Sequence, residues 1–203
     1  MSFLSGRTSL TTVQTGDLAD NAVTLAKMAG GTASYNIEYD GSGDPQEAVV
    51  AADVGKVAQV VSTQTGAVAT GTTVTPQDDT IPQNSEGVEF MTLAITPTAT
   101  NSTLVIEVIA NITHTAAGVN CTALFQDSTA SALAACDAQM AGTNRQTIAS
   151  LTHVMTAGTT SETTFKVRAG SHDAGTMTFN GDSGSRQYGG VLASSIVITE
   201  YLA

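Results

Sequence analysis

Apolar and polar residues alternate in short runs along most of the chain after residue 55. Leu104, Ile106 and Val108 fall on one face of an extended segment, and Phe165 and Val167 share a face of another. A period of two is the pattern of a half-buried β-strand. The sequence therefore predicts strands over 56–63, 68–75, 88–95, 103–114, 119–126, 131–138, 147–157, 162–169, 174–180 and 193–201.

Turn residues separate these runs at regular intervals, as at Pro76-Gln77-Asp78-Asp79 and at Asn84 to Gly87. Even spacing of short strands predicts an antiparallel β-sandwich or jelly roll, and hence a mainly β fold class. The last run is apolar on both faces, with Ile196 and Ile198 on one and Val197 and Tyr201 on the other. Such a strand is expected in the middle of a sheet or against a neighbouring subunit.

The first 50 residues follow a different pattern. Residues 1 to about 15 have no period and predict an extended arm, whereas Leu18, Ala22, Leu25 and Met28 have helical spacing that Gly30 and Gly31 would end. A helix this short needs a partner for its apolar stripe. Residues 31–55 contain the turn-rich stretch 39–45 and predict a linker. We therefore assign 1–50 to an arm, short helix and linker, and 51–203 to the sandwich domain.

Composition excludes several classes of protein. Charged residues make up 12% of the sequence, the net charge is −11, and acidic residues outnumber basic ones both before and after residue 50. Without a basic cluster or any Trp, binding to nucleic acid is disfavoured. The first residues lack the apolar run of a signal peptide, and no stretch has the length of a membrane span. We expect synthesis in a cytoplasm and no membrane insertion.

Two parts of the sequence carry a family resemblance. The stretch Gly16 to Thr32, followed by Tyr39 to Pro45, resembles the N-terminal region of tailed-phage fibre proteins. The stretch Val60 to Gln83, with Glu86-Gly87 and Ala123 to Asp127, is similar to a C-terminal domain that recurs in phage structural proteins. The resemblance implies a homotrimer located in the virion after assembly in the host bacterial cytoplasm. It does not distinguish a tail fibre from a head fibre.

The expected function is that of a bacteriophage virion structural protein without enzymatic activity or cofactors. In the first hypothesis the N-terminal segment attaches a trimeric fibre to a phage capsid or tail protein. The exposed sandwich then serves host adsorption, with a host surface glycan as the ligand. In the second hypothesis the protein is a capsid decoration or cement protein that stabilises the head and binds no host. A carbohydrate-acting enzyme is a remote third hypothesis.

Two groups of residues are candidates for these roles. Apolar side chains near the N-terminus are candidates for attachment and oligomerisation: Phe3, Leu4, Leu10, Leu18, Ala22, Leu25 and Met28. The alternative is a mobile polar arm, which is common at chain ends. A glycine-rich tip is the candidate receptor loop, with Asn180, Asp182, Arg186 and Tyr188. A plain long hairpin loop is at least as good an interpretation of this segment.

No motif marks a catalytic or metal site. His114, His153 and His172 have no paired spacing and favour structural or surface roles over a zinc site. The Asp78-Asp79-Thr80 sequence favours a capped turn over a calcium site. Glu86 and Glu89 could be a hydrolase acid pair only if a sugar cleft surrounded them.

The two cysteines give a prediction about strand register. The run between Cys121 and Cys136 predicts two strands around a tight turn at Ser128-Thr129, which lie at the midpoint of the pair. In a two-residue hairpin the cysteines would then lie directly opposite each other. Because cytoplasmic synthesis favours free thiols, we predict two facing, buried and reduced cysteines.

Overall fold

The computed structural model describes residues 35–39, 45–49 and 55–203. The chain divides into two compact units, Met1–Ala52 and Asp53–Ala203, which are considered separately. In the first unit, β1 (Tyr35–Tyr39) pairs antiparallel with β2 (Pro45–Val49). The predicted linker therefore contains an antiparallel pair of strands, and Tyr39 and Pro45, the two ends of the turn-rich stretch, pair with each other. The predicted short helix and the seven apolar attachment residues lie outside the described part of the chain.

The second unit is built from strands. Its larger strands are β3 (Val57–Thr65), β5 (Val88–Ile95), β6 (Thr103–His114), β7 (Gly118–Gln126), β8 (Ala134–Met140), β9 (Thr147–Thr156), β10 (Thr163–Ser171) and β14 (Ser194–Tyr201). Shorter strands are β4 (Ala69–Gly71), β11 (Met177–Phe179), β12 (Gly181–Asp182) and β13 (Ser185–Arg186). Between Gly55 and Ala203 the helical structure is a single 3-10 turn, η3 (Tyr188–Gly190). The predicted mainly β, antiparallel character of this region is confirmed.

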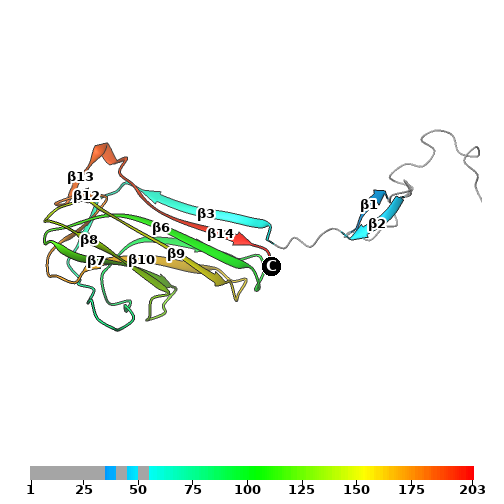
Figure 1. The fold of residues 1–203 in the computed structure, drawn as a ribbon, viewed down its shortest axis with the longest axis horizontal. Coiled ribbons are helices and arrows are strands. Elements are labelled where there is room, and N and C mark those ends of the chain that lie inside the picture. The colour runs from blue at the N-terminus through cyan, green and yellow to red at the C-terminus, as the bar shows by residue number, and fades with distance from the viewer. Residues whose placement is uncertain (1–34, 40–44, 50–54) are drawn as a thin grey trace, which may run out of the picture. The chain divides into compact units, whose positions relative to one another are not determined.

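The large strands form two antiparallel sheets (Figure 1). One has the order β5-β10-β7-β8, and the other has the order β3-β14-β6, with β9 on the far side of β6. Strands β11 and β4 extend the second sheet beyond the end of β14. This strand order is that of a jelly roll. As its apolar residues on both faces predicted, β14 lies inside a sheet, between β3 and β6.

The core lies between the two sheets. The alternation identified in the sequence points the predicted side chains inward, so Leu104, Ile106, Val108, Phe165 and Val167 are all buried. The rings of Phe90 on β5 and Phe179 on β11 stack with their centroids 4.8 Å apart and connect the two sheets. Burial of this apolar surface is the main source of the domain's stability.

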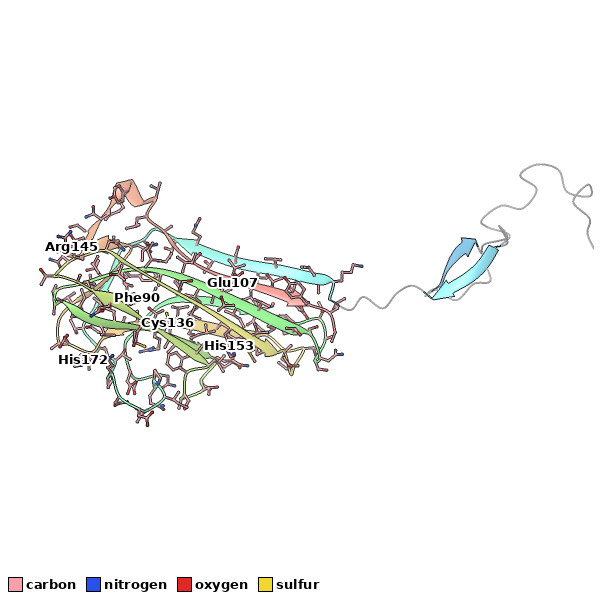
Figure 2. All side chains as sticks on the ribbon, in the orientation of Figure 1. Phe90, Glu107, Cys136, Arg145, His153 and His172 are labelled. Carbon is pink, nitrogen blue, oxygen red and sulfur yellow. The ribbon has the colours of Figure 1, made fainter. Side chains whose placement is uncertain are left out.

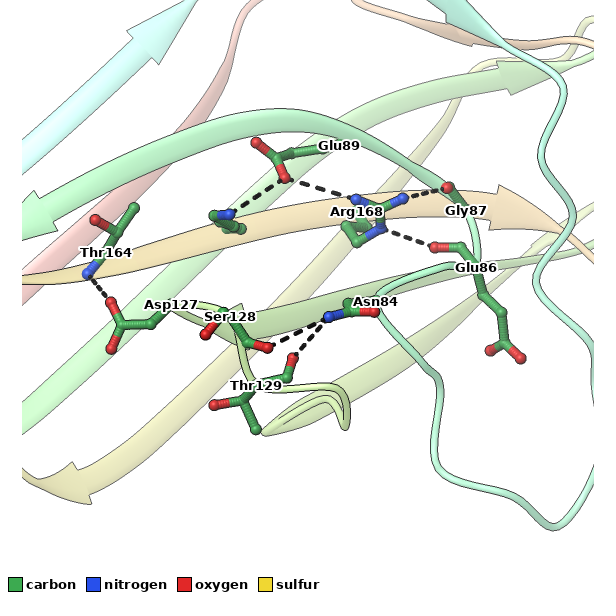
Figure 3. Close-up of polar contacts among 10 residues, drawn as sticks. Asn84, Glu86, Gly87, Glu89, Asp127, Ser128, Thr129, Thr164 and Arg168 are labelled. Atoms are coloured by element: carbon green, nitrogen blue, oxygen red, sulfur yellow. Dashed lines mark hydrogen bonds and ion pairs between the residues drawn. The ribbon is translucent and has the colours of Figure 1, made fainter.

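The segment 72–87 crosses the outer face of the four-stranded sheet. Its backbone carbonyls at Glu86 and Gly87 accept hydrogen bonds from Arg168 on β10, and Asn84 donates weakly to the 128–129 turn (Figure 3). Although Phe125 points to this outer side of β7, it is only 1% exposed. The chain therefore covers much of this outer face itself.

Most of the predicted strand boundaries agree with the structure to within a few residues. The clearest differences are at 68–75 and 174–180, where only three residues of each run form strands. Here the chain lies at the end of a sheet, where few partner residues remain. The hairpin of β12 and β13 was not predicted, because glycines dominate its sequence.

The predicted arrangement of the cysteines is wrong. Cys121 pairs with Asp137, and Thr122 pairs with Cys136. The pairing differs by one residue from the predicted one, and such a shift puts the two side chains on opposite faces of the sheet. A seven-residue loop, 127–133, replaces the tight turn, and Asp127 adopts a positive φ of 51° within it. Both cysteines are free, and both are half-buried rather than buried.

Candidate functional site

The glycine-rich segment after β11 forms a compact tip at one end of the sandwich. Strands β12 and β13 pair through Gly181 with Arg186 and through Asp182 with Ser185. Ser183 and Gly184 form the turn between them, with φ of 49° and 76°. Positive φ at both central residues is the geometry of a tight two-residue hairpin. The 3-10 turn η3 follows and leads into β14. We call residues 181–193 the tip.

A buried polar network fixes the base of the tip. The Asn180 side-chain amide donates to the carbonyls of Thr65 and Ala67, at 2.7 and 3.1 Å. Ser194 Oγ donates to Asn180 Oδ1, and Asn111 Nδ2 donates to the carbonyl of Ala193. These bonds join the ends of β3, β6, β11 and β14. Because buried polar groups are costly to leave unpaired, the network holds the tip in one position.

A close backbone contact adds to this rigidity. A Cβ placed on Gly66 would lie 1.9 Å from the carbonyl oxygen of Gly190. Only glycine allows the chain after β3 to pass so near the tip. The tip is therefore a supported element of the fold.

Large side chains project from this support into solvent. Tyr188 is 77% exposed and Val191 is 83% exposed, and Arg186 is exposed beside them. Tyr188 also has a φ of 48°, a left-handed conformation that is rare for a bulky residue. Such strain persists where the surrounding structure enforces it, and it is concentrated at functional sites.

The structure places the four residues of the predicted receptor loop in different surroundings. Arg186 and Tyr188 are exposed, and Asp182 is half-buried and accepts a hydrogen bond from Ser183. Asn180, in contrast, is fully buried and belongs to the supporting network. The sequence did not single out Val191, whose apolar character at an exposed position becomes evident only in the fold.

The tip and the start of the domain lie at opposite ends of the sandwich. Gly55 donates its backbone N–H to the carbonyl of Leu202, so the first described residues of this unit lie beside the end of β14. From there β3 runs the length of the sheet to the tip, as Figure 1 shows. Nine extended residues span about 30 Å. The domain therefore has an end where the preceding chain enters and a distal end with exposed side chains.

The three histidines do not come together. His114 is buried at the end of β6, where its Nδ1 accepts a hydrogen bond from the Ala116 N–H. His153 lies on β9 and His172 follows β10 (Figure 2). His172 Nε2 lies 3.6 Å from an Asp173 carboxylate oxygen. Across the described ranges, no three His, Cys, Asp or Glu residues form a group that could hold a metal ion.

The acidic candidates have structural partners. Glu86 accepts a hydrogen bond from the Gln83 N–H, and Glu89 lies 3.6 Å from Arg168 and 3.9 Å from Lys166 (Figure 3). Asp78 accepts a hydrogen bond from the Thr80 N–H, and its bonds with Thr80 lower the pKa of its carboxyl group. The predicted turn cap is confirmed.

A small hollow lies between the segment 75–82 and the outer side of β7 and β8. It has a volume of about 260 Å³, and Cys121, Asp137 and His172 are among its lining residues. Burial, with additional repulsion from Asp137, raises the pKa of Cys121 to about 12. A thiol with such a pKa is a poor nucleophile at neutral pH. The hollow is also smaller than typical ligand pockets.

No helix among the described residues has both the length and the apolar character needed to cross a membrane.

Comparison with known proteins gives remote structural similarities. No family model matches the chain, and no curated protein matches it. Eiger TNF from S. frugiperda superposes with a TM-score of 0.38 at 10% identity, covering 71% of this chain and 93% of that one. The VP2 subviral particle of infectious bursal disease virus gives 0.34 at 10% identity, with 79% and 40% covered. Tailspike protein 4 of bacteriophage CBA120, in its enzymatically active domain, gives 0.25 at 16% identity, with 61% and 19% covered. Similarity at this level assigns no function.

Proposed function

We propose that this protein is a bacteriophage virion structural protein, a homotrimeric fibre subunit that presents its sandwich domain for host adsorption. The observation that carries the proposal is that the two ends of the domain differ. The chain enters beside the end of β14, and the supported, exposed tip lies at the opposite end. A domain tethered through its N-terminal side would direct Arg186, Tyr188 and Val191 away from the tether.

The resemblance to phage fibre and structural proteins supports the location in the virion, and it is carried by residues 16–32, 39–45, 60–83, 86–87 and 123–127. In this proposal residues 1–50 attach the subunit to a phage capsid or tail protein. The low charge content and abundant Thr fit a solvent-facing structural protein that has few specific polar contacts.

The ligand proposed for the tip is a host surface glycan. Tyr188 offers an exposed aromatic face, Val191 of the same tip offers an exposed apolar side chain, and Arg186 offers hydrogen-bond donors. With a net charge of −11, the protein would be repelled by strongly anionic surfaces, which favours a neutral saccharide. A decoration protein that binds no host would not require this tip to be chemically distinctive.

Two experiments test the proposal. Antibody labelling of intact particles in the electron microscope should place the protein on the virion, and deletion of residues 1–30 should abolish its incorporation. Purified Tyr188→Ala and Arg186→Ala proteins should bind host cells at least about 10-fold more weakly than the wild type. Ile81→Ala is the matched control, because Ile81 is also exposed but lies on the 76–82 segment.

The outcomes separate the alternatives. If particles carry the protein and the wild type shows no binding to cells, the decoration function replaces adsorption. If particles do not carry it, the virion assignment is wrong.

A further inference from the structure

The outer face of the six-stranded sheet carries apolar side chains at exposed positions. Val60, Ile109, Ile148 and Val154 lie on it and are 57%, 46%, 63% and 59% exposed. They come from β3, β6 and β9, so the apolar surface extends across the sheet.

Strand register aligns part of this surface into a row. Thr199 on β14 pairs with Val60 on one side and Val105 on the other, and Val105 pairs with Val154. Four strands therefore contribute one continuous row of three valines and one threonine. In the next row Glu107 on β6 (Figure 2) pairs with Val197 and Thr152. It is the one charged side chain on this face within the paired parts of β3, β14, β6 and β9. We call this surface the apolar sheet face.

The opposite side of the sandwich shows what a covered face looks like. There the segment 72–87 crosses the four-stranded sheet, and Phe125 on that side is only 1% exposed. The remaining outer positions carry charges, including Lys166, Arg168 and Asp137. In the described ranges the apolar sheet face has neither a covering segment nor a charged surface. An exposed apolar patch of this kind marks an interaction site.

The edge strand β3 supports the same conclusion. Among the described strands it pairs only with β14, so its other side is an open edge. Its sequence, VAQVVSTQT, contains no charged residue and no proline. Those are the residues with which proteins protect an open edge from pairing with another chain. An unprotected edge next to an apolar face is expected to be buried in an assembly.

We propose that the apolar sheet face is the surface through which copies of this chain pack against one another. It deepens the proposed function, since it locates the contacts of the homotrimer on the sandwich domain. A second copy is the favoured occupant because the face is almost without charge. Because this face carries a single acidic side chain in its paired strands, copies of the chain can bring it together around a common axis with little like-charge repulsion, in the heterologous contacts of a closed ring.

Thiol labelling of the assembled full-length protein tests the proposal. Val154→Cys and Ile81→Cys are matched, because both positions are 59% exposed and lie on different surfaces. After light scattering has given the oligomeric state, labelling at each position is measured by peptide mass spectrometry. We expect a trimer in which Val154→Cys reacts at least about 10-fold more slowly than Ile81→Cys. Equal rates would overturn the proposal, and so would a monomer in which Val154→Cys is protected, because another segment of the same chain would then cover the face.

A second pair of variants tests the energetic role of the face. Val60→Lys/Val154→Lys buries two charges in the proposed interface and should weaken association between sandwich domains by about 100-fold or more. Ile81→Lys/Val74→Lys has the same change in charge at exposed positions on the segment 72–87 and should associate as the wild type does. If residues 1–50 keep the first variant trimeric, its β9 peptide, which carries the second substitution, should still gain amide hydrogen exchange relative to the wild type. Unchanged association together with unchanged exchange would overturn the proposal.

These results are independent of where the protein is found. A protected face on a protein that particles do not carry would leave the interface valid and the virion role wrong. A virion protein whose apolar sheet face is freely labelled would leave the virion role valid and the interface wrong.

Discussion

Ser194 Oγ lies 2.6 Å from Asn180 Oδ1 and donates a hydrogen bond to it. The two residues are 14 positions apart and enclose the whole tip. Because both are fully buried, this bond closes the base of the tip in an environment without competing water. The polar network therefore connects the stability of the core with the position of the exposed side chains.

Replacement of Asn180 tests that connection. Asn180→Ala removes two donated bonds and the bond accepted from Ser194, and it places alanine at a φ of 57°, where asparagine is tolerated better. We expect the free energy of unfolding to fall by about 2–4 kcal/mol, as measured by chemical denaturation. Asn180→Gly removes the backbone strain but does not restore the lost hydrogen bonds. It should therefore recover only part of the lost free energy of unfolding. Wild-type stability in Asn180→Ala would show that the network does not support the tip.

Tyr188 should be more important for binding than for stability. Its φ of 48° is strained for tyrosine, so Tyr188→Gly is expected to raise the free energy of unfolding by about 1 kcal/mol. Cell binding should be lost in the same protein. Val191→Gly is the control, since Val191 has an ordinary φ of −83° and glycine there should lower stability by about 0.5–1 kcal/mol. A large loss of stability in Tyr188→Gly would contradict a role in ligand contact.

Glu200 should make the domain sensitive to acid. Burial tends to raise the pKa of Glu200, but hydrogen bonds from Gln59 and Thr98 outweigh it and lower the pKa to about 2. Since the ordinary value is 4.5, the charged form stabilises the fold above pH 4.5, and this contribution is lost as the pH falls from 4.5 towards 2.

Thermal unfolding between pH 2 and 7 provides the measurement. Glu200→Gln should lower stability at pH 7 by about 1–3 kcal/mol, and the difference from the wild type should shrink as the pH falls below 4.5. Asp79→Asn is the matched control on an exposed turn and should leave the profile nearly unchanged. A constant difference at every pH would mean that the Glu200 charge does not stabilise the fold.

Cys121 should react slowly in the folded protein. With a pKa of about 12 it has very little thiolate at pH 8, so alkylation should be at least about 100-fold slower than for an exposed cysteine such as that of Ile81→Cys. Unfolding in denaturant should make both native thiols reactive. A mass lower by two hydrogens in the untreated protein would reveal a disulfide and contradict the observed register.

Much of the fold was predictable from local sequence. The alternation in 88–95 and 103–114 gave both strands with their observed boundaries, because burial of one face imposes a period of two on the side chains themselves. Glycine content, another local feature of the sequence, placed Arg186 and Tyr188 in an exposed turn, since glycine-rich sequences favour loops at the surface.

Pairing between strands was not predictable in this way. The midpoint of Cys121 and Cys136 suggested a register, but Asp127 takes a left-handed conformation and the loop is longer, so the pairing shifts by one residue. Asparagine is a residue type typical of loops, and only the contacts of Asn180 with strands distant in sequence show that it is buried.

The sequence by itself determined that the domain is made of antiparallel strands, which residues of each strand share a face, and where the turns fall. Tertiary structure alone decided which faces are covered. Val154 and Phe125 both look like residues of a buried strand, yet the segment 72–87 covers one side of the sandwich and no described segment covers the other. The physical reason is that periodicity is a property of a single strand. Burial depends instead on which distant segment, or which other copy of the chain, packs against that strand.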